Sequence, residues 1–117
     1  LHKRQVVVLA GGTGNPYFTT DTTAALRGLE LGAASLIKAT NVDGIYDADP
    51  ATDANASRYR YIDYDTAMVK NLKIMDAAAF ALCREHNLPI RVVNLGVKGN
   101  LQRAVKREDI GTLVARG

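Results

Sequence analysis

The feature that most constrains the fold is a glycine-rich loop that follows an apolar run and precedes an amphipathic segment. Gln5 to Ala10 contains a continuous Val-Val-Val-Leu run, which predicts a strand buried on both faces of a parallel sheet. Residues 22–32 begin after hydroxyl and carboxylate capping residues and predict a helix. The loop between them, with three glycines in residues 11–14, therefore lies where open α/β sheets bind ligands.

The chemistry of this loop suits a phosphorylated small molecule. Because glycines carry no side chain, backbone N–H groups can approach an oxyanion closely, and the amino end of the following helix favours negative charge. Hydroxyl, amide and aromatic side chains complete the candidate site: Thr13, Asn15, Tyr17, Phe18, Thr19 and Thr20. The alternative is a tight connection in which Asn-Pro forms a turn and Thr-Thr-Asp caps the helix. The segment is neither a dinucleotide fingerprint, since Tyr17 replaces its third glycine, nor a P-loop, since no Gly-Lys-Ser/Thr follows.

A second candidate site follows a second predicted strand. Residues 35–39 predict a buried strand that pairs in parallel with residues 5–10 through a right-handed crossover. The loop after it offers possible oxygen ligands and an aromatic ring that could stack on a base: Thr40, Asp43, Tyr46, Asp47 and Asp49. Both loops are expected to leave the same edge of the sheet and to face one crevice. The alternative is a solvated acidic turn that Pro50 ends.

The rest of the chain continues the alternation of strands and helices. Further strands are predicted over residues 58–61, 90–95 and 111–114. Further helices are predicted over residues 66–71, 73–87 (the longest) and 100–107. Asp63 or Asp65 is expected to cap the first of these helices and Asn100 the last, and residue chemistry alone favours Asp76 as an N-cap or first-turn acid. The pattern predicts an α/β fold.

Composition describes one ordinary globular unit of 117 residues, 47% hydrophobic and 23% charged, with a formal charge of +3. The cations are scattered, which argues against a nucleic-acid surface. The single cysteine, Cys83, falls in a helical pattern and is expected to be a buried free thiol, which fits a cytoplasmic protein. No apolar run reaches the ~20 residues that span a bilayer, so no membrane association is expected. Because the chain opens on a core strand without an initiator Met, we expect it to be a fragment of a longer protein.

Four segments together are similar to the carboxyl-terminal half of the bacterial uridylate kinases, which belong to the amino acid kinase family. They are residues 11–21 (GGTGNPYFTTD), 38–46 (KATNVDGIY), 73–76 (KIMD) and 87–92 (NLPIRV). The similarity covers nearly all of the chain in the family's order, and the related carbamate, acetylglutamate and aspartate kinases lack the Thr-Gly-Asn-Pro-aromatic-aromatic-Thr-Thr segment. The resemblance implies a partial amino acid kinase fold, a three-layer sandwich with a mainly parallel sheet. Residues 1–117 would form a single nucleotide-binding portion without the family's amino-terminal half.

The resemblance also implies a reaction, the transfer of the γ-phosphoryl group of MgATP to UMP to give UDP. The residues implied for UMP binding are Thr13, Gly14, Asn15, Pro16, Tyr17, Phe18, Thr19 and Thr20. The residues implied for ATP binding are Thr40, Asn41, Tyr46 and Asp49. Asp76 is implied as the catalytic carboxylate near the transferring phosphoryl group, which overturns its interpretation as a simple cap. Mg²⁺ is expected to be bound with ATP, and no residue of this chain is implied as a metal ligand.

The resemblance carries further expectations about the whole protein. The phosphate-clamping lysine, its Gly-rich loop and the effector-binding arginines of the family lie in the half that this chain lacks, so the chain alone is expected to be inactive. The family implies a homo-oligomer, a hexamer, with ATP and UMP as ligands and no nucleic-acid or membrane partner. Two alternatives stay open: a family member with another acceptor, which the Asn-Pro-Tyr-Phe set of residues 15–18 argues against, and a non-catalytic nucleotide-binding fragment.

Overall fold

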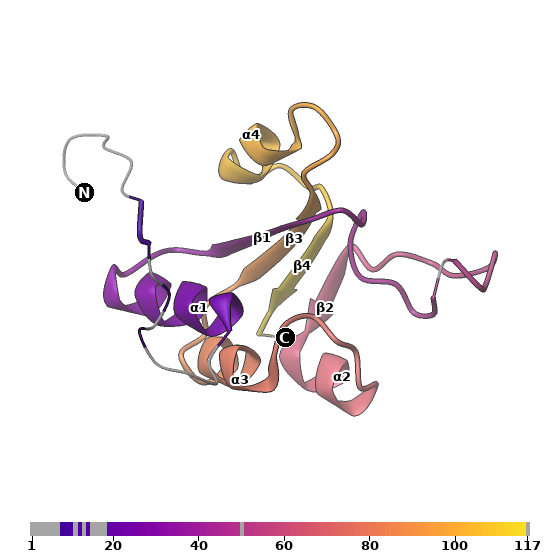
Figure 1. The fold of residues 1–117 in the computed structure, drawn as a ribbon. Helices are drawn as coiled ribbons and strands as arrows, with labels where there is room; N and C mark the ends of the chain where they lie inside the picture. Colours follow the sequence, from indigo (N-terminus) through magenta and orange to yellow (C-terminus); the bar gives the residue numbers. More distant parts are fainter. Residues whose placement is uncertain (1–7, 11, 13, 15–18, 50, 117) are drawn as a thin grey trace.

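Four short strands form one mixed sheet. The computed structural model describes residues 8–10, 12, 14, 19–49 and 51–116. In spatial order the strands are β1 (Leu36–Thr40), β3 (Ile90–Asn94), β4 (Thr112–Ala115) and β2 (Tyr61–Asp63). β1 runs parallel to β3 and β2 runs parallel to β4, while β3 and β4 are antiparallel (Figure 1). The sheet is therefore mainly parallel, as predicted.

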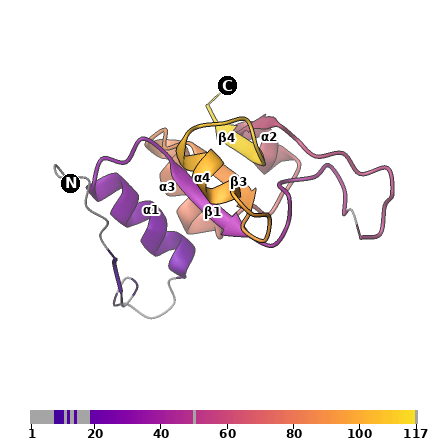
Figure 2. The ribbon, with the colours of Figure 1, turned by 90° about the horizontal axis from the view of Figure 1, so that it is seen from above.

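Helices cover both faces of this sheet. The elements on one face are α1 (Thr20–Glu30), α2 (Tyr64–Val69) and α3 (Ala77–Glu85), and α4 (Asn100–Val105) lies over β3 on the other face (Figures 1 and 2). α1 and α3 pack directly against each other. This three-layer α/β arrangement confirms the predicted fold class. None of the helices in the described ranges is long and apolar enough to cross a membrane.

The main core lies between the sheet and the layer of α1, α2 and α3. In the inner strand β3, Ile90 is fully buried and Val92 is buried on the same face. Ala25 of α1 and Ala79 of α3 are also fully buried, and their small side chains let the helix backbones pack closely. Cys83 of α3 is a buried free thiol, as predicted, and burial raises its pKa to about 11.

Side chains just before the helices fix where three of them begin. Thr19, Asp63 and Asp76 are the N-caps of α1, α2 and α3, and each side-chain oxygen accepts a hydrogen bond from the backbone N–H three residues later, at 3.4, 2.6 and 2.8 Å. The predicted caps of α2 and α3 are thus confirmed. The prediction for α4 was wrong, because Gly99 is the N-cap and the Asn100 side chain donates instead to the carbonyl of β3's last residue at 3.0 Å.

The predicted first strand is not seen in the part of it that the structure describes. Residues 5–7 lie outside the described residues, and residues 8–10 belong to no strand. The side chains of Val8 and Leu9 are 86% and 51% exposed, not buried on two faces. The apolar pattern indicates a strand, but a strand forms only where a neighbour pairs with its backbone. The observed parallel neighbour of β1 is β3, which lies 54 residues further along the chain, as the paired positions Thr40 and Asn94 show.

Most other elements begin or end one to three residues away from the prediction, and β2 and α3 differ at their starts for a visible reason. β2 begins at Tyr61, and Arg58 forms an isolated antiparallel bridge with Tyr46 rather than opening the strand. α3 begins at Ala77 rather than at residue 73, because the Asp76 side chain caps the helix there. With 9 residues, α3 is shorter than α1, which has 11. Residues 73–76 instead form a turn that approaches α1.

Candidate functional site

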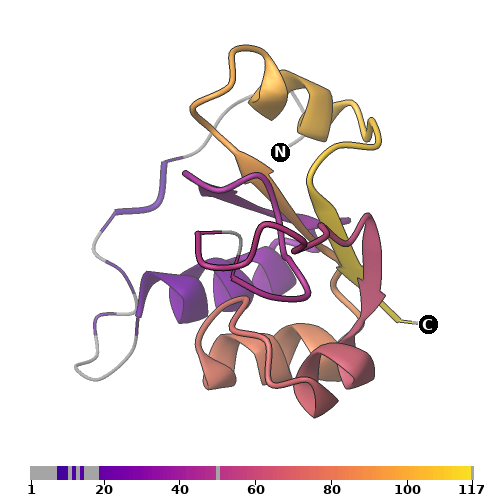
Figure 3. The same cartoon turned by 90° about the vertical axis from the view of Figure 1, so that its right-hand side faces the viewer.

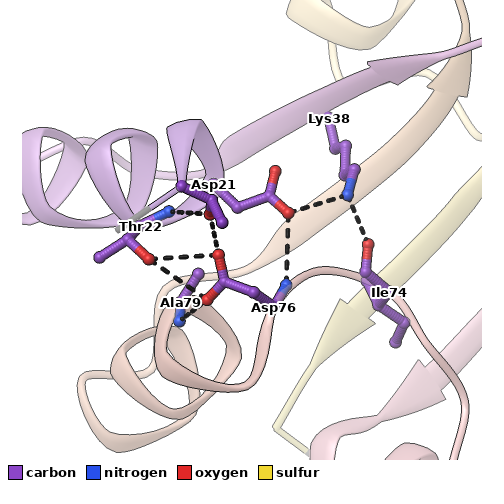
Figure 4. A network of polar contacts seen from close by, with 7 residues as sticks. Asp21, Thr22, Lys38, Ile74, Asp76 and Ala79 are labelled. Atoms are coloured by element: carbon purple, nitrogen blue, oxygen red, sulfur yellow. Dashed lines mark hydrogen bonds and ion pairs between the residues drawn. The ribbon is translucent and has the colours of Figure 1, made fainter. Parts of the chain in front are cut away.

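Five polar residues meet where the amino ends of α1 and α3 come together beside β1. We call this group, Thr19, Asp21, Thr22, Lys38 and Asp76, the helix-junction cluster (Figure 4). Thr19, Asp21 and Thr22 come from the start of α1, Lys38 from the middle of β1, and Asp76 from the cap of α3. Because α1 and α3 present the positive ends of their dipoles here, the cluster is suited to hold negative charge.

The carboxylate of Asp76 is held from three directions. It accepts hydrogen bonds from the Thr19 hydroxyl, from the Thr22 hydroxyl at 3.2 Å to each oxygen, and from the Ala79 backbone N–H at 2.8 Å. Burial alone would raise the pKa of Asp76, but these hydrogen bonds outweigh it and lower the pKa below its usual 3.8. Asp76 is therefore ionised at neutral pH, and its orientation is fixed.

Lys38 and Asp21 fix the turn that carries Asp76. Lys38 Nζ lies 3.2 Å from Asp21 Oδ2 and donates to the Ile74 carbonyl at 2.8 Å. The same Asp21 oxygen accepts the backbone N–H of Asp76 at 3.3 Å. Sequence reasoning did not single out Lys38 as a site residue, although a charged side chain within an apolar strand was a visible signal.

A cleft of about 650 Å³ opens beside the cluster, between α2, the turn at residues 71–76, and α3. Asp21, Lys38 and Asp76 line it together with an apolar wall. The apolar side chains of that wall include Met68, Leu72, Ile74, Met75 and Phe80. A cleft of this size, with an apolar wall and a few charged groups, is typical of small-molecule sites. Within the described residues, no group of three or more His, Cys, Asp or Glu side chains could hold a metal ion.

The structure describes three of the eight residues predicted to bind UMP. Gly14 is exposed and has a φ of +76°, Thr20 begins α1, and Thr19 donates its hydroxyl to Asp76. The others lie outside the described residues: Thr13, Asn15, Pro16, Tyr17 and Phe18. The contact between Thr19 and Asp76 joins the end of the glycine-rich loop directly to the predicted catalytic carboxylate.

The four residues predicted to bind ATP lie at the end of β1 and on the segment that follows it. The Thr40 carbonyl accepts from the Leu95 N–H at 2.8 Å, and Asn41 is exposed just after the strand. Tyr46 pairs with the far leg of the same segment, and Asp49 Oδ1 accepts from a backbone N–H two residues later at 2.9 Å. As far as the described residues go, none of the four lines the cleft beside Asp76.

Comparison with known proteins agrees with this architecture. The family model described as Amino acid kinase family matches residues 1–94. This chain belongs to the amino acid kinase family. Its mixed sheet and helical layers match solved members of the family, with a TM-score of up to 0.85 among the three structures described next.

Those three structures are UMP kinases by name. The UMP kinase from Bacillus anthracis is 34% identical with a TM-score of 0.85, and the match covers 89% of this chain and 43% of that one. The UMP kinase from Ureaplasma parvum is 39% identical with a TM-score of 0.84, covering 90% and 45%. The uridylate kinase from Archaeoglobus fulgidus is 35% identical with a TM-score of 0.75, covering 90% and 50%. The chain thus spans half or less of the length of these relatives.

Proposed function

We propose that this chain is the nucleotide-binding portion of a cytoplasmic UMP kinase, which transfers the γ-phosphoryl group of MgATP to UMP in pyrimidine nucleotide biosynthesis. The observation that carries the proposal is the position of Asp76. Its ionised carboxylate lies between two helix amino ends and is hydrogen-bonded to Thr19, the residue that ends the glycine-rich loop. The similarity to three UMP kinases supports UMP as the acceptor.

The helix-junction cluster suits phosphoryl transfer because this reaction depends mainly on positioning and electrostatics. The amino ends of α1 and α3 favour a phosphate group nearby. Asp76 acts by orienting cations rather than by accepting a proton, because the attacking oxygen of UMP is already ionised at neutral pH. Mg²⁺ bound with the donor phosphates would supply neutralisation of charge in the transition state, and the Asp76 carboxylate would help to orient it. Binding of Mg²⁺ through the nucleotide phosphates fits this site, whose described residues offer carboxylates but no group of three or more side chains that could hold the ion.

The cleft beside the cluster supports a nucleotide as the ligand. Its apolar wall, with Met75 and Phe80, suits the flat face of a base, and the charged residues Lys38 and Asp76 line the same cleft. A nucleotide could place its base against this wall and direct its phosphates toward the two helix amino ends. The predicted UMP residues 13–20 and the predicted ATP residues Thr40, Asn41, Tyr46 and Asp49 complete the proposed site.

The chain is proposed to be inactive by itself. It spans 43–50% of the length of the similar UMP kinases. Lys38 is a cation of the helix-junction cluster, and it is already paired with Asp21 and the Ile74 carbonyl. Neutralising a transferring phosphoryl group takes further cations, which we assign to the remainder of the kinase domain. The complete protein is proposed to assemble as a homo-hexamer.

The test is a steady-state assay of the full-length protein with MgATP and a panel of acceptors. UMP should be phosphorylated with saturation kinetics, and CMP and the carboxylates acetylglutamate and aspartate should react far more slowly. If another acceptor is preferred, the family assignment still holds, but UMP is rejected as the substrate. In parallel, residues 1–117 alone should bind UMP or ATP without turnover, and phosphorylation of UMP by this piece would reject the proposed inactivity.

A further inference from the structure

Thr112, on the inner strand β4, has a buried hydroxyl that the proposed site does not use. The side chain is fully buried, yet it is polar. Its Oγ1 donates to the Tyr59 carbonyl at 2.5 Å and accepts from the Ile45 N–H at 2.9 Å. A buried hydroxyl needs partners of this kind, since burying it without them is unfavourable. Here both partners belong to one segment that is remote in sequence.

That segment runs from Ile45 to Tyr59, between the end of β1 and the start of β2 (Figure 3). We call residues 46–58, of which the structure describes all but residue 50, the excursion. Its two legs are joined at the base by the Tyr59 N–H, which donates to the Ile45 carbonyl at 2.8 Å, and by an antiparallel bridge between Tyr46 and Arg58. Thr112 contacts the outgoing leg through an N–H and the returning leg through a carbonyl. One hydroxyl therefore ties both legs to β4.

The backbone beside Ile45 also packs tightly on this hydroxyl. A Cβ atom added at Gly44 would lie 2.6 Å from Thr112 Oγ1 and 3.0 Å from Arg58 Cδ. The base of the excursion thus has little freedom to shift relative to β4. Tyr46 and Asp49, which are predicted to contact ATP, lie on the excursion within a few residues of this anchor.

We propose that Thr112 is a positioning residue for the donor nucleotide. By holding the base of the excursion against β4, its hydroxyl sets the place of Tyr46 and Asp49 and so the affinity for MgATP, without touching the nucleotide. This inference rests on the proposed function. It predicts an effect on the donor alone, because the glycine-rich loop proposed for UMP joins the helix-junction cluster at α1, on elements that Thr112 does not contact through its hydroxyl.

The experiment compares three variants of the full-length protein. Thr112→Val keeps the shape and removes the hydroxyl, and Thr112→Ser keeps the hydroxyl. Val114→Ala destabilises the same strand at a fully buried position and leaves the hydrogen bonds of Thr112 in place. KM for MgATP, KM for UMP and thermal unfolding are measured for each. Thr112→Val should raise KM for MgATP by about 5- to 30-fold, the factor that corresponds to one or two lost buried hydrogen bonds. Its KM for UMP should stay within about twofold of wild type.

Each outcome either supports or overturns the role proposed for Thr112. Thr112→Ser should retain the wild-type KM for MgATP, and Val114→Ala should lose stability while keeping both KM values. An unchanged KM for MgATP in Thr112→Val, or an equal rise in both KM values, would overturn the inference. If Thr112→Val does not fold, Gly44→Ala displaces the same contact from the other side and should show the same selective rise. A wild-type protein that does not phosphorylate UMP would instead reject the proposed function, before any variant is compared.

Discussion

Replacing Asp76 by Asn separates the two roles that its position allows, N-cap and catalytic carboxylate. The carboxylate accepts hydrogen bonds from three donors: the Thr19 hydroxyl, the Thr22 hydroxyl, which is shared between the two oxygens, and the Ala79 N–H. An Asn side chain keeps one acceptor oxygen, which is enough to cap α3, and Asn is about as good an N-cap as Asp. The lost charge near two helix amino ends costs about 0.3–1 kcal/mol. The free energy of unfolding should therefore fall by only about 1 kcal/mol.

The effect of Asp76→Asn on turnover should be much larger than its effect on stability. A charged group that orients cations in a phosphoryl-transfer site acts mainly on the transition state, and losing it lowers kcat by about 100-fold or more. That factor corresponds to about 2.7 kcal/mol of activation free energy, well above the expected loss of stability. Binding of MgATP and UMP, measured by calorimetry on the full-length protein, should change little.

Asp65→Asn provides the matched control for this experiment. Asp65 is also near the start of a helix, but its side chain is 76% exposed and pairs with Arg84 at the surface. The substitution should leave kcat and both nucleotide affinities unchanged. If Asp76→Asn loses nucleotide binding and turnover in equal proportion, or loses neither, then Asp76 is a helix cap and the catalytic assignment is wrong.

Three further predictions concern stability and reactivity, all measured on the full-length protein. The pKa of Asp76 is lower in the folded chain than its usual 3.8, so the unfolded chain binds the proton more readily at acidic pH. The free energy of unfolding should therefore fall as the pH drops below about 4. Urea titrations should show a shallower fall for Asp76→Asn than for the wild type. Gly111→Ala should lose at least about 2 kcal/mol of stability in the same titrations, because φ is +66° and the new Cβ would lie 1.8 Å from the Val92 carbonyl oxygen. Gly32→Ala has a similar φ of +68° but open space around the new Cβ, so it should lose only about 1 kcal/mol. Cys83, fully buried and with its pKa raised to about 11, should resist alkylation at neutral pH until the protein unfolds, and rapid labelling of the folded protein would contradict its placement.

The features that the sequence predicted well are those set by local chemistry. Asp63 and Asp76 cap α2 and α3 because a short acidic side chain can reach the N–H three residues later, whatever surrounds it. The apolar run at residues 90–95 gave the most buried strand, since such a run is stable only in a core. The turn at Gly32, with its φ of +68°, ends α1, because glycine adopts a positive φ without strain.

Strand order and the helix-junction cluster depend on contacts between remote residues, so neither could be predicted from local patterns. The pairing of Leu36 with Ile90 joins positions whose local patterns say only that both are buried strands. Similarly, Lys38 and Asp21 are each plausible surface charges until β1 packs beside the start of α1. Thr112 is a typical β-strand residue in sequence, and its hydrogen bonds to Ile45 and Tyr59 exist only in the folded sheet.

β1 is the element that connects the two predicted nucleotide loops. Side chains alternate along a strand, so Lys38 and Thr40 lie on the same face of β1, roughly 7 Å apart along it. Lys38 contacts the start of α1, where the glycine-rich loop ends, while Thr40 begins the segment that is predicted to bind ATP. β1 therefore lies between the two predicted loops, and through Lys38 it also holds the turn at Ile74 that carries Asp76.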